Sequence, residues 1–355
     1  MDTKFLLKET TINHASDLYV VAGRPPTMKL KGRLLPFDQE PLTPAQTEAF
    51  VKELYTLADN RDFNKLQHGD DDFGVSIEGS GRYRVNAYRQ DGSFASVIRT
   101  IPLSIPDPAK LGIPEIVVNL ANNQRGIVLF TGTTGSGKST SLACLVDKIN
   151  TERENHIITI EDPVEFRHPH KKSIISQREI EIDTESYGTA LRAAMRQVPD
   201  VILLGEMRDY DTIGAAITAA ETGHLVFSTL HTIGAGATID RIIDVFPGNQ
   251  QNQIRSQLSV TLQAVVSQQL LPTVDGGIVA AFEIMIATSA IRNLIRESKT
   301  FQIENVLQTS LAQGMKTMDM SIFELFRQRL ITKETALQYS INQQLMEQRL
   351  SGQAR

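Results

Sequence analysis

Short apolar runs alternate with helical patterns along most of the chain after residue 114. The runs predict buried strands at 127–130, 157–160, 201–204, 225–228 and 280–286. Between these runs, apolar residues recur three and four positions apart, as on the buried face of a helix. Strands that alternate with helices predict a mostly parallel sheet covered on both faces. From residue 288 onward the pattern predicts short helices.

The first hundred residues have a different pattern and predict a small α/β domain. Alternating apolar residues predict strands at 73–77, 82–88 and 95–101. Pro44 at a first helical position after Thr43 predicts a helix over 44–58. The proline-rich stretch 101–113 predicts an extended linker. We therefore expect domains at 1–100 and 114–355, joined by a linker at 101–113.

A glycine-rich loop directly follows the apolar run 127–130. It matches G-x-x-x-x-G-K-[ST] at every fixed position and precedes a helical pattern that contains Leu142 and Leu145. Such a loop points backbone N–H groups at phosphates, and the following helix begins with its positive dipole end there. The pattern predicts a site for ATP and Mg²⁺. The residues expected to bind the nucleotide are Gly132, Thr133, Thr134, Gly135, Ser136, Gly137, Lys138, Ser139 and Thr140.

Polar side chains follow the predicted strands at the edge where ligands of parallel sheets gather. Glu161 follows the strand at 157–160, with Glu165 a few residues on, and Glu206 follows the strand at 201–204. His231 follows the strand at 225–228, and His224 lies just before it. A single acid after a strand is more often a helix cap or a solvated residue. Several such strand ends beside one glycine loop favour catalytic chemistry.

Three arginines lie on the last two strands of the N-terminal domain. Arg82 and Arg84 project from one face of their strand, and Arg99 lies on the next strand. Arginines on an exposed sheet face are commonly solvated. The functional alternative is an arginine that reaches a triphosphate, including one bound to a neighbouring subunit.

The amino-acid composition argues against several classes of protein. The chain has 355 residues, of which 41% are hydrophobic and 22% charged, and it contains no apolar run near the 18 residues of a membrane helix. The N-terminus does not resemble a signal peptide, so we expect a cytoplasmic protein. The net charge of −5 and the absence of tryptophan argue against a nucleic-acid motor. The single Cys144 excludes a four-cysteine zinc site and is expected to be a core residue.

Several motifs occur together and in order: GTTGSGKST, IITIEDPVEF, DVILLGEMRD, TAAETGHLVFSTLHT and AIRNLIRE. They resemble the Walker A, Asp box, Walker B, His box and C-terminal motifs of the type IV pilus retraction ATPases, a branch of the secretion and traffic ATPases. ASDLYV, RYRVNAY and VIRTIP resemble segments of the PAS-like N-terminal domain of that family. The resemblance covers about residues 3–340. It implies an α/β protein with a PAS-like domain, a RecA-like P-loop ATPase domain and C-terminal helices.

The resemblance also implies roles for individual residues. Lys138 would hold the phosphates, while Ser139 and Glu206 would hold the Mg²⁺ ion. Glu165 matches the glutamate that polarises the attacking water, and Glu161 is the alternative, which the sequence does not separate from it. The residues implied to sense the γ-phosphate or to hold the catalytic geometry are His224 and His231. The residues implied to reach the nucleotide from the N-terminal domain are Arg84, Arg99 and, as a weaker match, Arg82.

The family forms hexameric rings, so the resemblance implies a homohexamer that powers pilus retraction and twitching motility. The implied partners are an inner-membrane pilus platform protein and a PilU-like paralogue, without insertion into the membrane and without nucleic acid. The implied location is the inner face of the cytoplasmic membrane. An assembly ATPase would carry a longer N-terminal region and a four-cysteine site, which this sequence lacks. A non-hydrolysing scaffold would be expected to lack Glu165 or Glu206.

Overall fold

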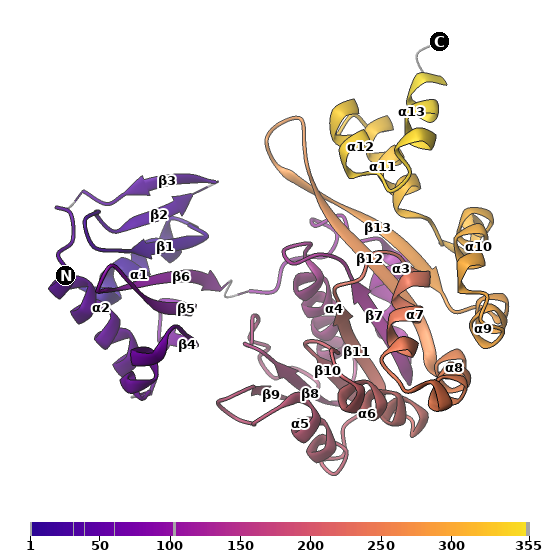
Figure 1. The fold of residues 1–355 in the computed structure, drawn as a ribbon, viewed down its shortest axis with the longest axis horizontal. Helices are drawn as coiled ribbons and strands as arrows, with labels where there is room; N and C mark the ends of the chain where they lie inside the picture. Colours follow the sequence, from indigo (N-terminus) through magenta and orange to yellow (C-terminus); the bar gives the residue numbers. More distant parts are fainter. Residues whose placement is uncertain (1, 31, 39, 60, 102–103, 353–355) are drawn as a thin grey trace. The chain divides into compact units, whose positions relative to one another are not determined.

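The computed structural model describes residues 2–30, 32–38, 40–59, 61–101 and 104–352. The chain divides into two compact units (Figure 1). The first unit contains Met1–Ser104 together with the short segment Pro163–Arg167, and the second contains Ile105–Asp162 and His168–Arg355. The sequence did not predict that 163–167 would group with the N-terminal unit. Residues 102 and 103 of the expected linker lie outside the described residues.

The first unit is built on one antiparallel sheet with the strand order β3-β2-β1-β6-β5-β4. Its strands are β1 (Asp17–Val20), β2 (Thr27–Leu30), β3 (Arg33–Pro36), β4 (Asp71–Ile77), β5 (Gly81–Gln90) and β6 (Ser93–Ile101). The predicted strands at 73–77, 82–88 and 95–101 correspond to β4, β5 and β6. Their alternating buried side chains form one face of the sheet, which explains why the pattern was readable in the sequence.

Helices α1 (Thr3–Ile12) and α2 (Pro44–Leu57) and the 3₁₀ helix η1 (Phe63–His68) pack on that face. Their apolar side chains, such as Leu6 and Phe50, meet Leu18 and Val85 of the sheet. Helix α2 begins with a capping box. The Thr43 side chain accepts a hydrogen bond from the N–H of Gln46, and the Gln46 side chain accepts one from the N–H of Thr43. The predicted helix start is confirmed.

The second unit is built on a mostly parallel sheet with the strand order β13-β12-β7-β11-β10-β8-β9. Its strands are β7 (Gly126–Thr131), β8 (His156–Glu161), β9 (Ile174–Glu179), β10 (Val201–Leu204), β11 (Leu225–Leu230), β12 (Leu262–Pro272) and β13 (Ile278–Ile286). Only β13 pairs antiparallel with its neighbour, β12. The predicted mostly parallel sheet is confirmed.

Helices cover both faces of this sheet, as the continuous apolar strands require. Val128 and Phe130 of β7 pack on the face covered by α3 (Glu115–Val118), η2 (Asn119–Asn122) and α4 (Lys138–Glu152). Ile127 and Leu129 face the opposite core. The helices of that core include α5 (Tyr187–Ala194), α6 (Tyr210–Glu221), α7 (Ala235–Asp244) and α8 (Gly248–Thr261). Cys144 is buried in α4 as expected, and burial raises the pKa of its thiol to about 11.

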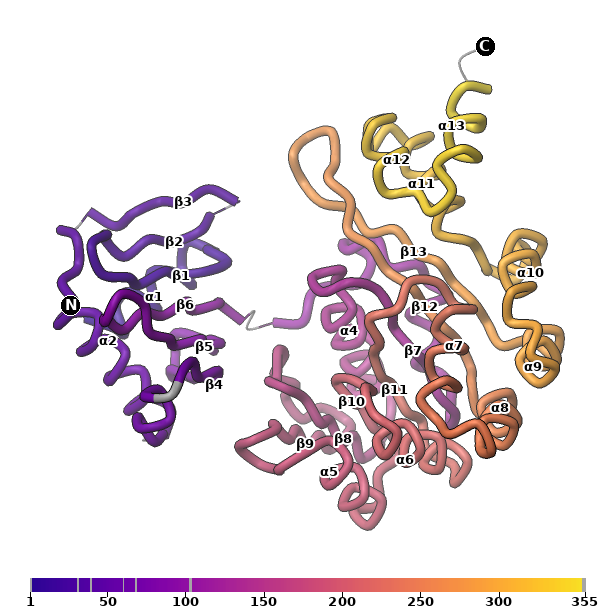
Figure 2. The backbone as a smooth tube through the Cα atoms, viewed as in Figure 1, coloured from indigo at the N-terminus to yellow at the C-terminus, as the bar shows by residue number. Residues whose placement is uncertain are grey.

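Two strands of this sheet were not predicted. β12 follows α8 directly, as the tube in Figure 2 shows, without a glycine or proline to mark the boundary. Its polar residues Ser267, Gln268 and Gln269 interrupt the apolar run, although the first two are buried. β9 is an edge strand with a half-polar sequence. Both strands are stabilised by neighbours distant in sequence, so local periodicity did not reveal them.

Short helices complete the second unit, as predicted. They are α9 (Ser289–Arg296), η3 (Thr300–Gln302), α10 (Ile303–Thr309), η4 (Leu311–Gln313), α11 (Met318–Arg327), α12 (Lys333–Tyr339) and α13 (Gln343–Gly352). The last three form a core with Leu271 and Ala281 of the β12–β13 hairpin. Over the described residues, no helix combines the length and the apolar character needed to cross a bilayer.

Candidate active site

The glycine loop lies between β7 and α4 and packs against β12. Gly132 has φ 135°, and a Cβ atom at this position would lie 2.4 Å from the backbone oxygen of Gln268. Gly137 is left-handed with φ 89° and caps α4, and a Cβ there would lie 2.7 Å from Nε2 of Gln268. Only glycine fits both places. The loop is therefore curled tightly against the neighbouring strand at the start of a helix.

Lys138 is the first residue of α4, and its ammonium group lies inside the curve of the loop. The side chain is 7% exposed, and Nζ donates to the backbone oxygens of Gly132 at 2.8 Å and Thr133 at 2.9 Å. Ser139 and Thr140 follow in the first turn and are half-buried. The buried hydroxyl of Ser136 has no hydrogen-bond partner among the described residues. A buried cation and an unpaired donor beside a helix N-terminus fit a phosphate group.

Gln268 of β12 supports this loop from the side and was missed by the sequence analysis. Its Oε1 accepts a hydrogen bond of 2.9 Å from Ser141, in the first turn of α4. The hydroxyls of Thr131 on β7 and Ser267 on β12 also lie 2.7 Å apart. These contacts join residues more than 120 positions apart in the chain. No local signal could have found them, because β12 itself was not predicted.

A cavity of about 440 Å³ opens beside the loop, within the second unit. Its lining is mostly apolar and includes Leu111, Ile113, Leu270 and Ala280, with Thr140 on the side of the loop. A mostly apolar cavity with a few polar groups is typical of a small-molecule site. Because this mostly apolar cavity adjoins the phosphate loop, it can take the base of a nucleotide.

The carboxyl ends of β8, β10 and β11 meet at one edge of the sheet, since these strands pair in parallel and in register. Glu206 follows β10 there and is 16% exposed. Its Oε1 accepts a hydrogen bond from Nε of Arg208 and lies 3.6 Å from Nε2 of His231. The hydrogen bond to Glu206, and then its charge, raise the pKa of Arg208. This pairing was not predicted from the sequence.

Glu161 lies at the same edge, at the end of β8. Its Oε1 accepts hydrogen bonds from Oγ1 of Thr159 at 2.6 Å and from Nε2 of Gln177 at 3.3 Å. The side chain of Tyr187 approaches Gly205, the residue between β10 and Glu206. Its hydroxyl would be 2.9 Å from a Cβ atom at Gly205, which explains the glycine there. Burial, followed by the nearby charges of Asp162, Glu206 and Glu161, raises the pKa of Tyr187.

One predicted residue lies elsewhere in the second unit, and another belongs to a segment that groups with the first unit. Glu165 belongs to 163–167, which groups with the first unit. His224 lies at the opposite edge, before β11, where its Nδ1 is 2.9 Å from the backbone oxygen of Ala219. The six residues of β11 separate His224 from His231 by roughly 20 Å. His224 therefore does not join the strand ends beside the phosphate loop of its own chain.

The three arginines lie within the sheet of the first unit. Arg84 on β5 is paired directly across the ladder with Arg99 on β6. Arg84 forms an ion pair of 2.8 Å with Asp72, and Arg99 donates from Nε to Asp17 at 3.1 Å. Arg82 is buried. Arg82 therefore does not fit the simple solvated alternative, whereas the side chains of Arg84 and Arg99 are 35% and 66% exposed.

Comparisons with known proteins show which family this chain belongs to. Residues 113–349 match the family model described as Type II/IV secretion system protein. The type IV pilus retraction ATPase PilT of Pseudomonas aeruginosa is 45% identical over 95% of this chain and 97% of its own length. The chain belongs to this family. The predicted family and the predicted ATPase activity are therefore confirmed.

A second relative and a crystal structure are also similar to this chain. The type IV pilus ATPase PilU of Pseudomonas aeruginosa is 40% identical to this chain, over 96% of the chain and 89% of PilU. A crystal structure of the pilus retraction motor PilT with bound ADP matches with a TM-score of 0.90 and 44% identity, over 98% of this chain and 99% of that one. The predicted fold, an N-terminal α/β domain followed by a P-loop ATPase domain, is confirmed.

Proposed function

We propose that this secretion-family ATPase is the motor that retracts a type IV pilus. The observation that carries the proposal is the phosphate loop with its buried Lys138, which follows β7 at the same edge of the sheet where Glu161 ends β8 and Glu206 follows β10. The similarity to a pilus retraction ATPase extends over nearly the whole chain, including the N-terminal unit. The relative whose structure contains ADP supports ATP as the nucleotide.

In this proposal, the loop residues bind the phosphates of ATP. Lys138 exchanges its contacts with two loop carbonyls for phosphate oxygens, which offer a stronger, charge-assisted hydrogen bond. Ser139 and Glu206 would hold the Mg²⁺ ion, which neutralises charge on the phosphates when it is bound. Because Arg208 and His231 both approach Oε1 of Glu206, they set the orientation of this carboxylate.

The water-polarising residue is one of two carboxylates. Glu165 matches the family motif, whereas Glu161 lies at the strand end next to that of Glu206 in the second unit. Separate Glu161→Gln and Glu165→Gln variants distinguish them, because only the variant at the catalytic position should abolish hydrolysis while binding of ATP persists. His231 is assigned to hold the geometry at the γ-phosphate. His224 is assigned the same role only toward a neighbouring subunit, because it lies at the opposite edge in its own chain.

The arginines of the first unit would contribute from outside the phosphate loop. Arg84 and Arg99 now pair with carboxylates of their own sheet, and a triphosphate would compete for them as a more highly charged acceptor. Arg82 is the third member of this group. We assign the chain to a homohexamer at the inner face of the cytoplasmic membrane. There it would act on a pilus platform protein and share the work with a PilU-like paralogue.

Deletion of the gene in the source organism, with surface pili counted by electron microscopy, tests this function. More pili together with lost surface motility are expected, since pili would be assembled without being withdrawn. A plasmid copy should restore motility, and a Lys138→Ala copy should not. Cells without pili would show that the motor assembles pili instead, and an unchanged number of pili would contradict any role at the pilus.

A further inference from the structure

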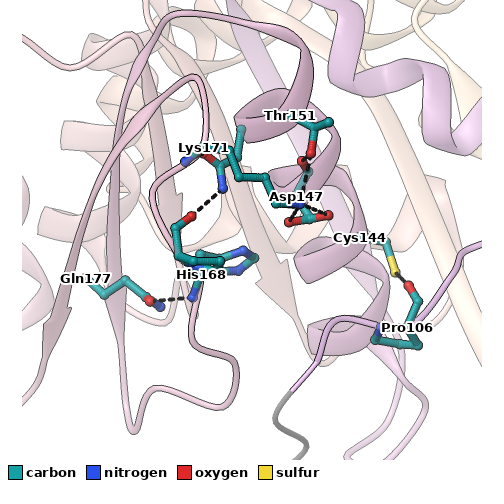
Figure 3. A network of polar contacts seen from close by, with 9 residues as sticks. Pro106, Cys144, Asp147, Thr151, His168, Lys171 and Gln177 are labelled. Carbon is teal, nitrogen blue, oxygen red and sulfur yellow. Dashed lines mark hydrogen bonds and ion pairs between the residues drawn. The ribbon is translucent and has the colours of Figure 1, made fainter.

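Gln177 on the edge strand β9 joins two points of the chain that flank the segment 162–167. Its Oε1 accepts a hydrogen bond of 2.9 Å from the backbone N–H of His168, as Figure 3 shows. Its Nε2 donates to Oε1 of Glu161 at 3.3 Å. A backbone N–H can only donate and a carboxylate can only accept, so the two partners determine which way the amide is turned.

The two partners of Gln177 lie on either side of the segment that groups with the first unit. Glu161 ends β8 and is separated from this segment by Asp162, and the chain returns to the second unit at His168. One side chain therefore closes the base of the loop that carries Glu165.

The His168 end of this link is firmly held. Its imidazole is buried, and burial lowers the pKa of the ring to about 4, so the ring is neutral near pH 7. The following residues are bound to Asn150 of α4, which accepts from the N–H of Lys171 through Oδ1 at 3.1 Å and donates to the backbone oxygen of Pro169 at 2.7 Å. Helix α4 begins at Lys138, directly after the phosphate loop. The residues after His168 are therefore hydrogen-bonded to the helix that follows this loop.

We propose that Gln177 is a positioning residue that closes the base of the loop 162–167 and holds the Glu161 carboxylate in place for hydrolysis. This inference rests on the proposed function, in which either Glu161 or Glu165 polarises the attacking water. Gln177 acts through Glu161, together with Thr159, and does not itself touch the nucleotide. Neither the glycine loop nor the family motifs quoted above include this residue.

Two variants of the full-length protein test the link. Gln177→Leu removes both hydrogen bonds, and we expect a kcat for ATP hydrolysis about tenfold lower with KM changed less than twofold. Gln177→Glu retains the acceptor for the N–H of His168 but places a second carboxylate against Glu161. Because a like charge raises the pKa of a carboxyl, the acid limb of the kcat–pH profile should move up by about one unit.

The matched control is Gln257→Leu. Nε2 of Gln257 donates to Oε2 of Glu221 at 2.8 Å on the surface of α8 and α6, so the same kind of bond is removed away from the site. Its kcat and pH profile should equal those of the wild type. The rate of amide hydrogen exchange at His168 is an independent measurement. It should increase in Gln177→Leu and remain unchanged in Gln257→Leu.

The outcomes separate the link from the proposed function. A Gln177→Leu variant with wild-type kcat, beside an impaired Glu161→Gln variant, overturns the link and leaves the role of Glu161 intact. A reduced kcat in Gln177→Leu with an unmoved acid limb in Gln177→Glu also overturns it, because the effect would then not pass through Glu161. Wild-type kcat in Glu161→Gln overturns the proposed role of Glu161 itself.

Discussion

Nε2 of His231 lies 3.6 Å from Oε1 of Glu206, the oxygen that also accepts the hydrogen bond from Arg208. His231 follows β11 and Glu206 follows β10, so the pairing depends on the parallel register of these two strands. Arg208 is only two residues from Glu206, but its side chain is 76% exposed. The carboxylate thus lies between a side chain from its own loop and one from the neighbouring strand end.

Glu206→Gln should lower kcat for ATP hydrolysis on the order of 100-fold, because a neutral amide cannot replace the charge at the reacting centre. Binding of ATP should change much less, since the phosphate loop stays intact. Steady-state hydrolysis and titration with a fluorescent ATP analogue measure the two effects. Glu221→Gln, on the surface of α6, is the control. Equal kcat in both variants would remove Glu206 from the site.

Lys138→Ala should weaken nucleotide binding about 30- to 150-fold, because a charge-assisted phosphate contact is worth roughly 2–3 kcal/mol. Hydrolysis should fall close to background. Lys148→Ala on the same helix is the matched control, since Lys148 pairs with Glu152 at 2.6 Å on the outer side of α4. Calorimetric titration with ADP compares the two variants. Similar dissociation constants would contradict the assignment of the phosphate site.

His168 should make the second unit sensitive to acid. Desolvation lowers the pKa of its buried ring from 6.5 to about 4, so between these values the unfolded chain binds a proton that the folded chain does not. This contribution to stability is present above pH 6.5 and is lost as the pH falls. The loss amounts to about 2 kcal/mol of unfolding free energy between pH 7.5 and 5.

Urea unfolding of the wild type and of His168→Leu at these two pH values measures that loss. The variant should lose less stability on acidification, by about the amount that the titration of His168 contributes. His170→Gln, at an exposed position two residues away, should retain the wild-type pH dependence. An identical pH dependence in all three proteins would show that His168 does not titrate in the unfolding equilibrium.

Arg292 stabilises the end of helix α8. Its Nη1 donates to the backbone oxygens of Ser259 at 2.8 Å and Val260 at 2.6 Å, which lie in the last turn of the helix. Arg292→Ala should reduce the free energy of unfolding by about 2 kcal/mol, because it removes charged hydrogen bonds and leaves a helix end uncapped. Thermal or urea unfolding measures this. Arg296→Ala, at an exposed position of α9, should have little effect, and equal destabilisation would contradict the capping role.

The features predicted from the sequence are those whose determinants are contiguous. The strand, loop and helix over 127–149 follow from an apolar run, three glycines and a helical repeat within one short stretch. β10 was predicted with its observed bounds because a parallel strand buried on both faces has an apolar sequence throughout. Placing Glu161, Glu206 and His231 at one edge required only the rule that parallel strands end together.

The sequence by itself thus determined the phosphate loop, the two carboxylates of the sheet edge and the class of fold, because short-range pattern and backbone geometry specify them. Tertiary structure alone decided that Gln268 supports the loop, that Gln177 bridges Glu161 and His168, and that 163–167 groups with the first unit. It also decided that His224 lies at the opposite edge from His231. These relationships depend on strand neighbours and on contacts between distant residues, which periodicity along the chain does not encode.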